Sequence, residues 1–528
     1  MAVKAMKDKT RESSLPEFRN EPFTDFSRPE NRSAMQAAVE KVRGQLGREY
    51  DLIIGGKKIR TAEKFCSYNP SRKDEVVGVF QKCTPELAAR AVEAAHEYFP
   101  RWAKAPAEQR AGTLLKASQI LRRRKFEMAA WMVFEVGKSW AEADGDVAEA
   151  LDFCEFYARE MLRLAGSQPL TPVSGEENEL RYIPLGVGVV ISPWNFPLAI
   201  MLGMSSAAWV AGNTVVLKPS SDSPAVAAQW MGILQEAGLP SEVVNFLTGS
   251  GAVVGDTLVK HPQTRFISFT GSKEVGLNIN EQAAKTAPGQ IWIKRVVAEM
   301  GGKDSIVVDS DVNLDAAVEG VFVSAFGYQG QKCSACSRAI VAADVYDSFV
   351  EKLRARAETI RMGAADDPDN YMGPVINETA KKSMLEYIEV GKKEGRLILG
   401  GQTAPGDGHF IQPTIIADVA PKARISQEEI FGPVLAVLKA RDFDDALEIA
   451  NNTEYGLTGA VFSNSREHLE QARSSFHVGN LYFNRKCTGA LVGGHPFGGF
   501  NMSGTDSKAG GRDYLLLFTQ AKAVSEKI

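Results

Sequence analysis

Two cysteines lie three positions apart in the segment GYQGQKCSACSR, residues 327–338, in a chain that has six cysteines. Such a pair can belong to a metal site, act as a thiol–disulfide redox pair, or contain a single nucleophilic thiol. A structural zinc site needs four ligands, and the chain has no second CxxC. A thioredoxin-like pair is expected in a smaller βαβ domain. The pattern therefore favours one reactive thiol, with the alternative that both cysteines are simply packed.

Two further residues could support such a thiol. Asn195 lies in ISPWNFP, where an amide in a proline-flanked turn can donate a hydrogen bond to an oxyanion. Glu299 lies in VAEMGGKD, where two adjacent glycines allow the backbone to approach closely. Each residue also has an ordinary interpretation, because a buried Asn often caps a turn and a single Glu is often solvated. Only the combination of all three groups points to catalysis.

Composition and charge exclude several classes of protein. The 528 residues are 44% hydrophobic and 24% charged, which is typical of a globular chain with two or three domains. The net charge of −4 gives no basic field for nucleic acid. Sparse cysteines indicate a reducing compartment, and residues 1–14 contain no apolar segment of a signal peptide. We therefore expect a cytoplasmic protein with a small-molecule partner.

One stretch without charged residues extends over 36 positions, from Tyr182 to Leu217. Its length alone would allow a membrane span, but three prolines and several glycines interrupt it. A lipid-exposed backbone must remain continuously hydrogen-bonded. We therefore expect a buried strand, a loop and a helix, with no membrane insertion.

The expected elements follow an alternating pattern. We expect a helix over 30–47, with an apolar face formed by Ala34, Ala37, Val39 and Val42. A helix-rich segment follows it. Short β-branched runs at 187–191, 213–218, 242–247 and 265–270 then alternate with helical segments, which is typical of βαβ units with a parallel sheet. A second α/β region is expected from about 301 to 497, with strands at DSIVVD and AIVAA.

Six motifs in this order resemble the aldehyde dehydrogenase superfamily: ISPWNFP, VVLKPSS, FTGSKEVG, EMGGKD, GQKCSACSR and EEIFGPV. The separation of Glu299 from Cys333, which is 333 − 299 = 34 positions, matches the base and the nucleophile of that family. The resemblance implies an α/β fold with a Rossmann-type cofactor domain, an α/β catalytic domain and a small β oligomerisation arm. The implied division is 1–162 for an N-terminal extension and helical part of the cofactor domain, 163–185 for the arm with a C-terminal segment near 506–528, 186–300 for the NAD-binding domain and 301–500 for the catalytic domain.

The resemblance also implies a mechanism. Cys333 would attack the aldehyde carbon, and the Asn195 amide with the Cys333 backbone N–H would hold the oxyanion. Glu299 would activate the water that hydrolyses the thioester. Cys336 has no role in this scheme and is interpreted as a packed thiol. No metal is expected.

NAD would be the cofactor. Lys218 matches a residue on the adenosine ribose, Glu429 and Phe431 match residues on the nicotinamide ribose, and the glycines of GSKEVG differ from a GxGxxG fingerprint. The full set of implied cofactor residues is Ile191, Ser192, Trp194, Lys218, Ser221, Gly251, Gly255, Gly271, Ser272, Gly276, Glu429 and Phe431. Many NAD-preferring members carry a Glu where this chain has Ser221, and that carboxylate would repel a 2′-phosphate. We therefore expect NAD use with tolerated NADP.

Further segments resemble one branch of the family, the bacterial 1-pyrroline-5-carboxylate dehydrogenases. These are NEPFTDF, WIKRVVAEMGGKD and LYFNRKCTGALVGG followed by PFGGFNMSGT. The branch oxidises L-glutamate γ-semialdehyde to L-glutamate, the second step of proline catabolism. The implied substrate-binding residues are Ser334, Gly489, Ala490, Phe497, Phe196 and Glu149, the last of which is otherwise interpreted as a surface carboxylate.

Two alternatives remain. The chain could oxidise another acidic aldehyde, such as succinic semialdehyde, or could be a non-catalytic protein that retains the fold. Retention of Cys333, Glu299 and Asn195 argues against the latter. The resemblance implies a homo-oligomer, either a dimer or an assembly of dimers, and a possible proline dehydrogenase partner.

Overall fold

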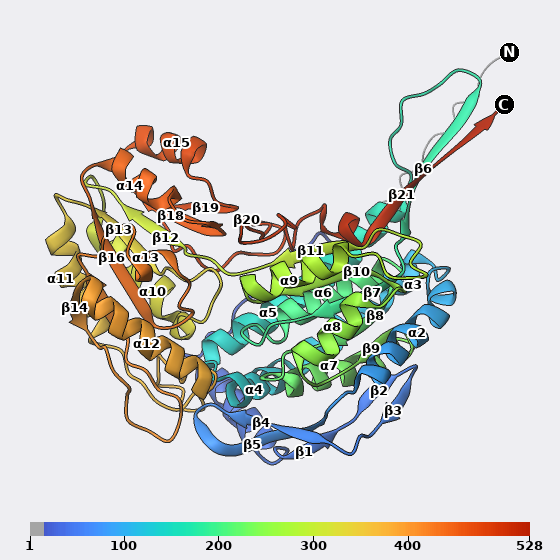
Figure 1. The fold of residues 1–528 in the computed structure, drawn as a ribbon, viewed down its shortest axis with the longest axis horizontal. Coiled ribbons are helices and arrows are strands. Elements are labelled where there is room, and N and C mark those ends of the chain that lie inside the picture. Colours follow the sequence, from blue (N-terminus) through green and yellow to red (C-terminus); the bar gives the residue numbers. More distant parts are fainter. Residues whose placement is uncertain (1–14) are drawn as a thin grey trace.

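The computed structural model describes residues 15–528. Two seven-stranded sheets, each covered by helices, form its two main parts, and a two-stranded ribbon projects from one of them (Figure 1). The predicted absence of an N-terminal signal rests on residues 1–14, which lie outside the described residues. The predicted α/β fold class is confirmed.

The first sheet has the strand order β11-β10-β7-β8-β9-β2-β3. The first five strands are parallel, and β2 and β3 add an antiparallel hairpin at one edge. The four predicted strands of this region are confirmed, with boundaries within two residues. The bounds are β2 Leu52–Ile54, β3 Lys57–Ile59, β7 Val187–Ile191, β8 Thr214–Lys218, β9 Val244–Phe246, β10 Thr264–Thr270 and β11 Arg295–Glu299.

Helices cover both faces of this sheet because its strands are apolar on both sides. On β7, Val190 faces a core with α3 to α7, whereas Val187 and Val189 face a core with α2, α8 and α9. The bounds are α2 Pro85–Trp102, α3 Ala107–Arg123, α4 Lys125–Val136, α5 Trp140–Ala165, α6 Ala199–Val210, α7 Pro224–Ala237, π-helix η1 Gly251–Gly255, α8 Asp256–Lys260 and α9 Lys273–Ala284.

The strand order reverses between β7 and β10. From β7 the chain adds β8 and β9 on one side, and then returns to place β10 and β11 on the other. In doubly wound sheets a crevice opens at the carboxyl ends of the two strands where the order reverses, and ligands bind there. Ser192 and Gly271 directly follow these two strands.

The second sheet has the order β14-β15-β16-β13-β12-β18-β19, parallel except for β14. Helices α10 and α11 cover one face, and α12, α14 and α15 cover the other. The strands are β12 Ser305–Val308, β13 Arg338–Ala342, β14 Arg396–Leu399, β15 Thr414–Ala417, β16 Val434–Ala440, β18 Thr458–Phe462 and β19 Asn480–Phe483. The helices are α10 Leu314–Phe326, 3₁₀-helix η2 Gly327–Gly330, α11 Tyr346–Ala357, α12 Glu378–Glu394, α13 Arg424–Gln427, α14 Phe443–Asn451 and α15 Arg466–Ser475.

The projecting ribbon pairs β6, Glu176–Pro184, antiparallel to β21, Thr519–Lys527. Both strands leave the first part of the molecule together, so the outer edges of the ribbon lie away from the rest of the chain (Figure 1). A short 3₁₀-helix, η3 Tyr514–Phe518, precedes β21, and the small pair β17 Tyr455–Gly456 and β20 Phe500–Asn501 lies near the second sheet.

The N-terminal part differs from the prediction in two respects. A three-stranded sheet of β1 Arg48–Tyr50, β4 Lys64–Asn69 and β5 Arg72–Gln81 lies in a segment where no strand was predicted. Helix α1, Pro29–Arg43, buries Met35, Val39 and Val42, so the predicted face was partly wrong, because Ala34 and Ala37 are exposed. The larger Met35 side chain fills more space in the core than Ala34 or Ala37 would.

The uncharged stretch from Tyr182 folds as predicted into a buried strand, a loop and a helix, namely β7, residues 192–198 and α6, followed by β8. Within residues 15–528, no helix combines the length and the apolar character that crossing a membrane requires.

Candidate active site

Cys333 lies in a turn between η2 and β13, and unusual backbone precedes it. Tyr328 and Gln329 have φ angles of 51° and 55°, in the left-handed region that non-glycine residues rarely adopt. Their side chains hold this conformation: the Tyr328 hydroxyl donates to Val136 O at 3.1 Å, and the Gln329 amide donates to Pro374 O at 2.8 Å. The nucleophile turn is thus fixed from two other parts of the chain, as expected for strain stored at a functional site.

The Cys333 thiol is half-buried. Burial raises its pKa well above the ordinary value, and the carboxylates of Asp304, Glu429 and Glu299 raise it further. The thiol is therefore protonated at neutral pH. Conversion to the nucleophilic thiolate requires a base or a nearby positive charge.

Asn195 lies almost fully buried in the turn between β7 and α6. Its Nδ2 donates to the backbone oxygen of Gln331 at 3.1 Å, two residues before the candidate nucleophile. An amide nitrogen has two hydrogens, so one remains for another acceptor. The backbone N–H of Cys333 donates to no acceptor within residues 15–528. Two free donors therefore stand beside the thiol, which is the arrangement that an oxyanion needs.

Glu299 ends β11 in a half-buried position. Its carboxylate accepts hydrogen bonds from the Ser507 hydroxyl, from Gly499 N at 3.2 Å and from Ser507 N at 3.4 Å. Burial is the largest effect and raises the pKa of Glu299 to about 7. A carboxylate with a pKa near the working pH is well suited to act as a general base.

The two glycines after Met300 bring these groups together. A Cβ on Gly301 would lie 2.1 Å from a carboxylate oxygen of Glu429, and one on Gly302 would lie 2.8 Å from the backbone oxygen of Cys333. Neither position has room for a side chain. The EMGGKD motif therefore lets the segment after β11 pass between Glu429 and the nucleophile turn.

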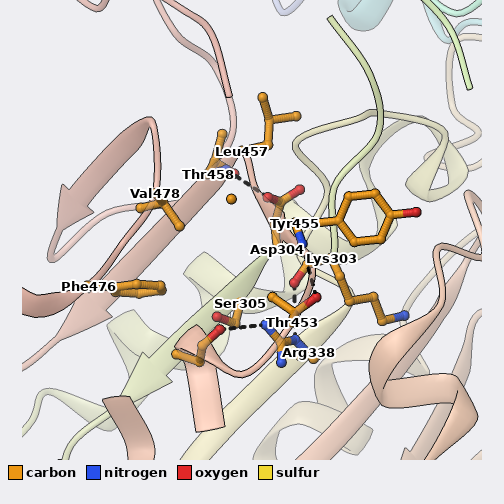
Figure 2. A pocket seen from close by; sticks show the side chains of 12 residues that line it. Lys303, Asp304, Ser305, Arg338, Thr453, Tyr455, Leu457, Thr458, Phe476 and Val478 are labelled. Atoms are coloured by element: carbon orange, nitrogen blue, oxygen red, sulfur yellow. Dashed lines mark hydrogen bonds between the residues drawn. The ribbon is translucent and has the colours of Figure 1, made fainter. Parts of the chain in front are cut away.

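Lys303 and Asp304, the next residues, line a small cavity of about 10 Å³ (Figure 2). Buried Arg338 donates through Nε to Lys303 O at 3.0 Å, and Thr458 N donates to Asp304 Oδ1 at 2.7 Å. A space of this size holds at most one water molecule. The cavity therefore belongs to the support of the site and does not bind the substrate.

The second cysteine of the CxxC pair lies in the core. Cys336 is 2% exposed, donates to Arg338 O at 3.4 Å and lies beside Cys487. All six cysteines are free. Within residues 15–528, no cluster of three His, Cys, Asp or Glu side chains is arranged to hold a metal ion. The structure thus brings only Cys333 to the candidate site.

The cofactor residues predicted near β7 and β8 meet at the crevice described above. Lys218, at the end of β8, is 3% exposed; its Nζ donates only to Pro219 O at 3.2 Å, and burial lowers its pKa to about 8. The hydroxyl of Ser192 is buried with no partner in the described part of the chain. Buried polar groups are normally hydrogen-bonded, so these two indicate a polar ligand.

The glycines on this side have two different roles. A Cβ on Gly251 would meet nothing, and one on Gly255 would make only ordinary contact with Ile191, so η1 leaves open space. At Gly271 and Gly276 a Cβ would lie within 2.6 Å of the Phe269 ring and the Met300 sulfur. These two glycines therefore allow α9 to pack against β10.

Other predicted residues complete the crevice. Ser272 caps the N-terminus of α9 without a side-chain capping bond, so its hydroxyl and the helix N–H groups are available to an anion. Ser221 is exposed, and its hydroxyl donates to Gly249 O at 3.0 Å. This bond joins the loops that follow β8 and β9.

On the opposite wall, Glu429 accepts from Gly302 N at 3.1 Å, and burial raises the pKa of Glu429 to about 7. Phe431 has a φ of 56°, and its ring lies edge-on to Trp194 at 5.6 Å. These residues come from the second part of the molecule, so the crevice has walls from both parts. The donors, the free helix N-terminus and the glycine openings fit a dinucleotide.

Three of the predicted substrate residues, Ser334, Gly489 and Ala490, lie in the nucleophile turn or in a loop tied to it. The backbone oxygen of Ser334 accepts from Cys487 Sγ at 3.3 Å, which ties the nucleophile turn to the loop 487–490. The Ser334 hydroxyl and the backbone N–H groups of Gly489 and Ala490 have no hydrogen-bond partner within residues 15–528. Gly489 has a φ of +77°, which explains the glycine there.

The two aromatic residues predicted to contact the substrate are Phe196, in the turn between β7 and α6, and Phe497, in the loop between β19 and β20. The Phe196 ring lies under the Lys138 ammonium, 3.7 Å from Nζ to the ring centre. Lys138 is fully buried and paired with Asp146 at 2.7 Å. Phe497 is fixed by two backbone hydrogen bonds to Ala509, at 2.8 and 2.6 Å.

Glu149 lies half-buried on α5. Burial raises its pKa to about 8, with Asp146 adding to the effect, and its charge acts on the Cys333 thiol. No hydrogen bond or ion pair joins its carboxylate to another described residue. Its carboxylate is therefore close enough to act electrostatically on the thiol and has no partner of its own.

The structure adds residues that the sequence did not indicate. Ser507 holds Glu299 from 208 positions away, and Gln331 joins Asn195 to the nucleophile turn. No local pattern marks either of them. Lys138 was detectable in principle, because a lysine directly after the apolar run MAAWMVFEVG is often buried and paired.

Comparison with known proteins agrees with this geometry. Residues 58–524 match the aldehyde dehydrogenase family, and the chain belongs to that family. It is similar to 1-pyrroline-5-carboxylate dehydrogenase of Geobacillus thermodenitrificans, with 59% identity over 96% of this chain and 99% of that protein. The resemblance inferred from the motifs is thus confirmed.

Two solved structures are also similar. A 1-pyrroline-5-carboxylate dehydrogenase from Thermus with bound NAD has 52% identity and a TM-score of 0.96, covering 98% of this chain and 100% of that one. Proline utilization A from Bdellovibrio bacteriovorus has 46% identity and a TM-score of 0.95, covering 97% of this chain and 53% of that one.

Proposed function

We propose that this protein oxidises L-glutamate γ-semialdehyde, in equilibrium with 1-pyrroline-5-carboxylate, to L-glutamate in the second step of proline catabolism. Its full-length similarity to 1-pyrroline-5-carboxylate dehydrogenases supports this assignment. The observation that carries it is the pair of free N–H groups at Gly489 and Ala490 beside the nucleophile turn. Such fixed donors suit the α-carboxylate of an amino-acid aldehyde.

The first chemical step belongs to Cys333. The thiol loses its proton to water, the sulfur adds to the aldehyde carbon, and the resulting oxyanion accepts hydrogen bonds from Asn195 Nδ2 and the Cys333 N–H. NAD, when bound in the crevice, is the hydride acceptor. Loss of hydride from the thiohemiacetal leaves a thioester on Cys333.

The second step belongs to Glu299. Its carboxylate removes a proton from a water molecule that attacks the thioester, and L-glutamate and the free thiol are released. At its pKa of about 7, the carboxylate is substantially ionised at neutral pH. Hydrogen bonds from Ser507 and Gly499 hold the Glu299 carboxylate in a fixed orientation.

Recognition of the substrate takes place at its other end. Gly489 and Ala490 donate to the α-carboxylate with Ser334 beside them, Phe196 and Phe497 pack on the aliphatic part, and Glu149 accepts from the α-ammonium group. Anchoring this end fixes the aldehyde near Cys333, so that loss of the anchor lowers turnover as well as affinity.

The cofactor is NAD, with NADP tolerated because Ser221 places no carboxylate near the ribose. Residues 186–300 hold the cofactor together with the helical part of 1–162, and 301–500 supply the nucleophile.

The ribbon of β6 and β21, the core of the arm 163–185 and 506–528, joins subunits into a dimer or an assembly of dimers. The location is cytoplasmic, and a proline dehydrogenase is the expected partner, since a related domain lies within proline utilization A.

The test compares glutamate semialdehyde, succinic semialdehyde and propionaldehyde by the absorbance of reduced NAD. Wild type should prefer the first substrate, and Gly489→Val should damage that activity selectively, because a side chain there has a strained φ and contacts Lys486 at 3.2 Å. Equal use of all three aldehydes by wild type would refute the named substrate. It would leave the membership of the family intact.

A further inference from the structure

Arg485 lies directly behind the loop that carries the two free N–H groups. Its Nη2 donates to the backbone oxygen of Thr488 at 2.9 Å and to that of Gly489 at 3.0 Å. One guanidinium nitrogen with two hydrogens therefore binds two consecutive carbonyl groups. Neither bond is part of a helix or a strand.

These two carbonyls belong to the same peptide groups as the free donors. The carbonyl of Thr488 shares its plane with the N–H of Gly489, and the carbonyl of Gly489 shares its plane with the N–H of Ala490. In a trans peptide the C=O and N–H bonds point in opposite directions. By holding both oxygens on its side, Arg485 directs both N–H groups to the other side of the loop.

The guanidinium is itself fixed. Its central carbon lies 4.4 Å from the centre of the Tyr482 ring, which is 6% exposed at the end of β19. The ring of His495 lies edge-on to Tyr482 at 5.8 Å, and His495 Nδ1 accepts from Leu491 N at 3.1 Å. Both ends of the loop 488–491 are thus attached to one buried tyrosine.

We propose that Arg485 is a positioning residue for the substrate's α-carboxylate and thereby determines specificity for amino-acid aldehydes. It acts through the orientation and polarisation of two peptide groups and does not contact the substrate. This inference rests on the proposed function. It assigns to Arg485 an effect that only substrates with an α-carboxylate detect.

Three variants separate orientation from charge. Arg485→Met removes the cation and both hydrogen bonds, Arg485→Lys keeps the cation but loses the planar guanidinium, and Lys486→Met removes the neighbouring cation while both carbonyl bonds remain. The assays are kcat/KM for glutamate semialdehyde and for propionaldehyde, and the inhibition constant of L-glutamate against propionaldehyde oxidation. Thermal unfolding of each variant is measured alongside.

We expect Arg485→Met to lower kcat/KM for glutamate semialdehyde by roughly tenfold or more, as for lost charge-assisted hydrogen bonds, and to weaken inhibition by L-glutamate to a similar extent. Propionaldehyde oxidation should stay within about twofold of wild type, because that substrate has no carboxylate to orient. Arg485→Lys should be intermediate, and Lys486→Met close to wild type.

Several results would overturn the inference. Only charge would matter if Arg485→Lys kept full kcat/KM for glutamate semialdehyde and Lys486→Met lost as much of it as Arg485→Met. Equal losses on both substrates would mean a merely structural role; if Arg485→Met does not fold, Arg485→Lys and its inhibition constant decide. A wild type that does not prefer glutamate semialdehyde would contradict the proposed function, whereas a preference that survives in Arg485→Met contradicts only the role of Arg485.

Discussion

Replacement of Glu299 by glutamine should separate the two chemical steps. Glutamine keeps one acceptor oxygen, which can still accept from Ser507, but its amide nitrogen cannot accept the bond from Gly499 N, and it cannot take a proton from water. Hydride transfer precedes the step that needs this base, so the first turnover should proceed near the wild-type rate. Hydrolysis of the thioester should slow by about 10²–10⁴-fold, the usual contribution of a general base.

The pKa of Glu299 sets the pH dependence of the wild type. Burial raises it from 4.5 to about 7, and only the ionised form can act as a base. With a pKa of about 7, roughly a tenth of the molecules carry the carboxylate at pH 6. Steady-state turnover should therefore fall as the pH decreases through 7, and Glu299→Gln should lose this pH dependence along with most of the rate.

Ser507→Ala provides a matched control. The Ser507 hydroxyl donates to Glu299 and lowers its pKa, so its removal should move the acidic limb of the profile to higher pH without abolishing turnover. A shifted pH profile with retained turnover would mean that the pKa of Glu299 has changed, whereas a loss of turnover would mean that its carboxylate has moved.

The assay is rapid mixing of enzyme, NAD and glutamate semialdehyde with detection of reduced NAD. Glu299→Gln should give a burst of about one equivalent per active site followed by slow turnover. Loss of the burst itself would place Glu299 before hydride transfer, as the base that deprotonates Cys333. An unchanged pH profile in Ser507→Ala would refute the link between that hydroxyl and the base.

Two other substitutions follow from the same geometry. Cys333→Ala should abolish dehydrogenase turnover while NAD titration by fluorescence shows nearly unchanged binding, and Cys336→Ala should cost little turnover; the reverse outcome would mean that the nucleophile is Cys336. Ser221→Glu should shift the ratio of kcat/KM values toward NAD by a factor that corresponds to about 1 kcal/mol, because a carboxylate near the ribose repels a 2′-phosphate. An unchanged ratio would show that Ser221 does not face the ribose.

Part of the order of strands and helices was predictable, namely β7 to β10 with their helices and the strands β12 and β13, because local sequence patterns depend on burial. The β-branched runs of β7, β8 and β10 alternate with helical segments, and their boundaries were correct within two residues. The strands β1, β4 and β5 were not predicted, because segments with many charged and polar residues, such as Arg72–Gln81, are only partly buried. Their pairing depends on distant partners that no short window contains.

The candidate site likewise contains residues that the sequence predicted and residues that it did not. The chemistry of Cys333, Asn195 and Glu299 was indicated by residue type and by family resemblance, but the groups that hold them were not. Gln331 orients Asn195, and Ser507 orients Glu299, through contacts across 136 and 208 positions. Such partners are defined only by the fold, since a serine or glutamine in isolation has no distinctive pattern.

Glu299 and Glu149 show how similar pKa shifts can belong to different roles. Burial raises both, to about 7 and about 8. Glu299 accepts hydrogen bonds from two residues that keep part of its population ionised, as a base requires. Glu149 is half-buried and has no partner within residues 15–528, and an unpaired carboxylate removed from water is costly until a cation approaches. In the function that we propose, the α-ammonium group of an amino-acid aldehyde is this cation, so that loss of solvent would prepare Glu299 for proton transfer and Glu149 for recognition.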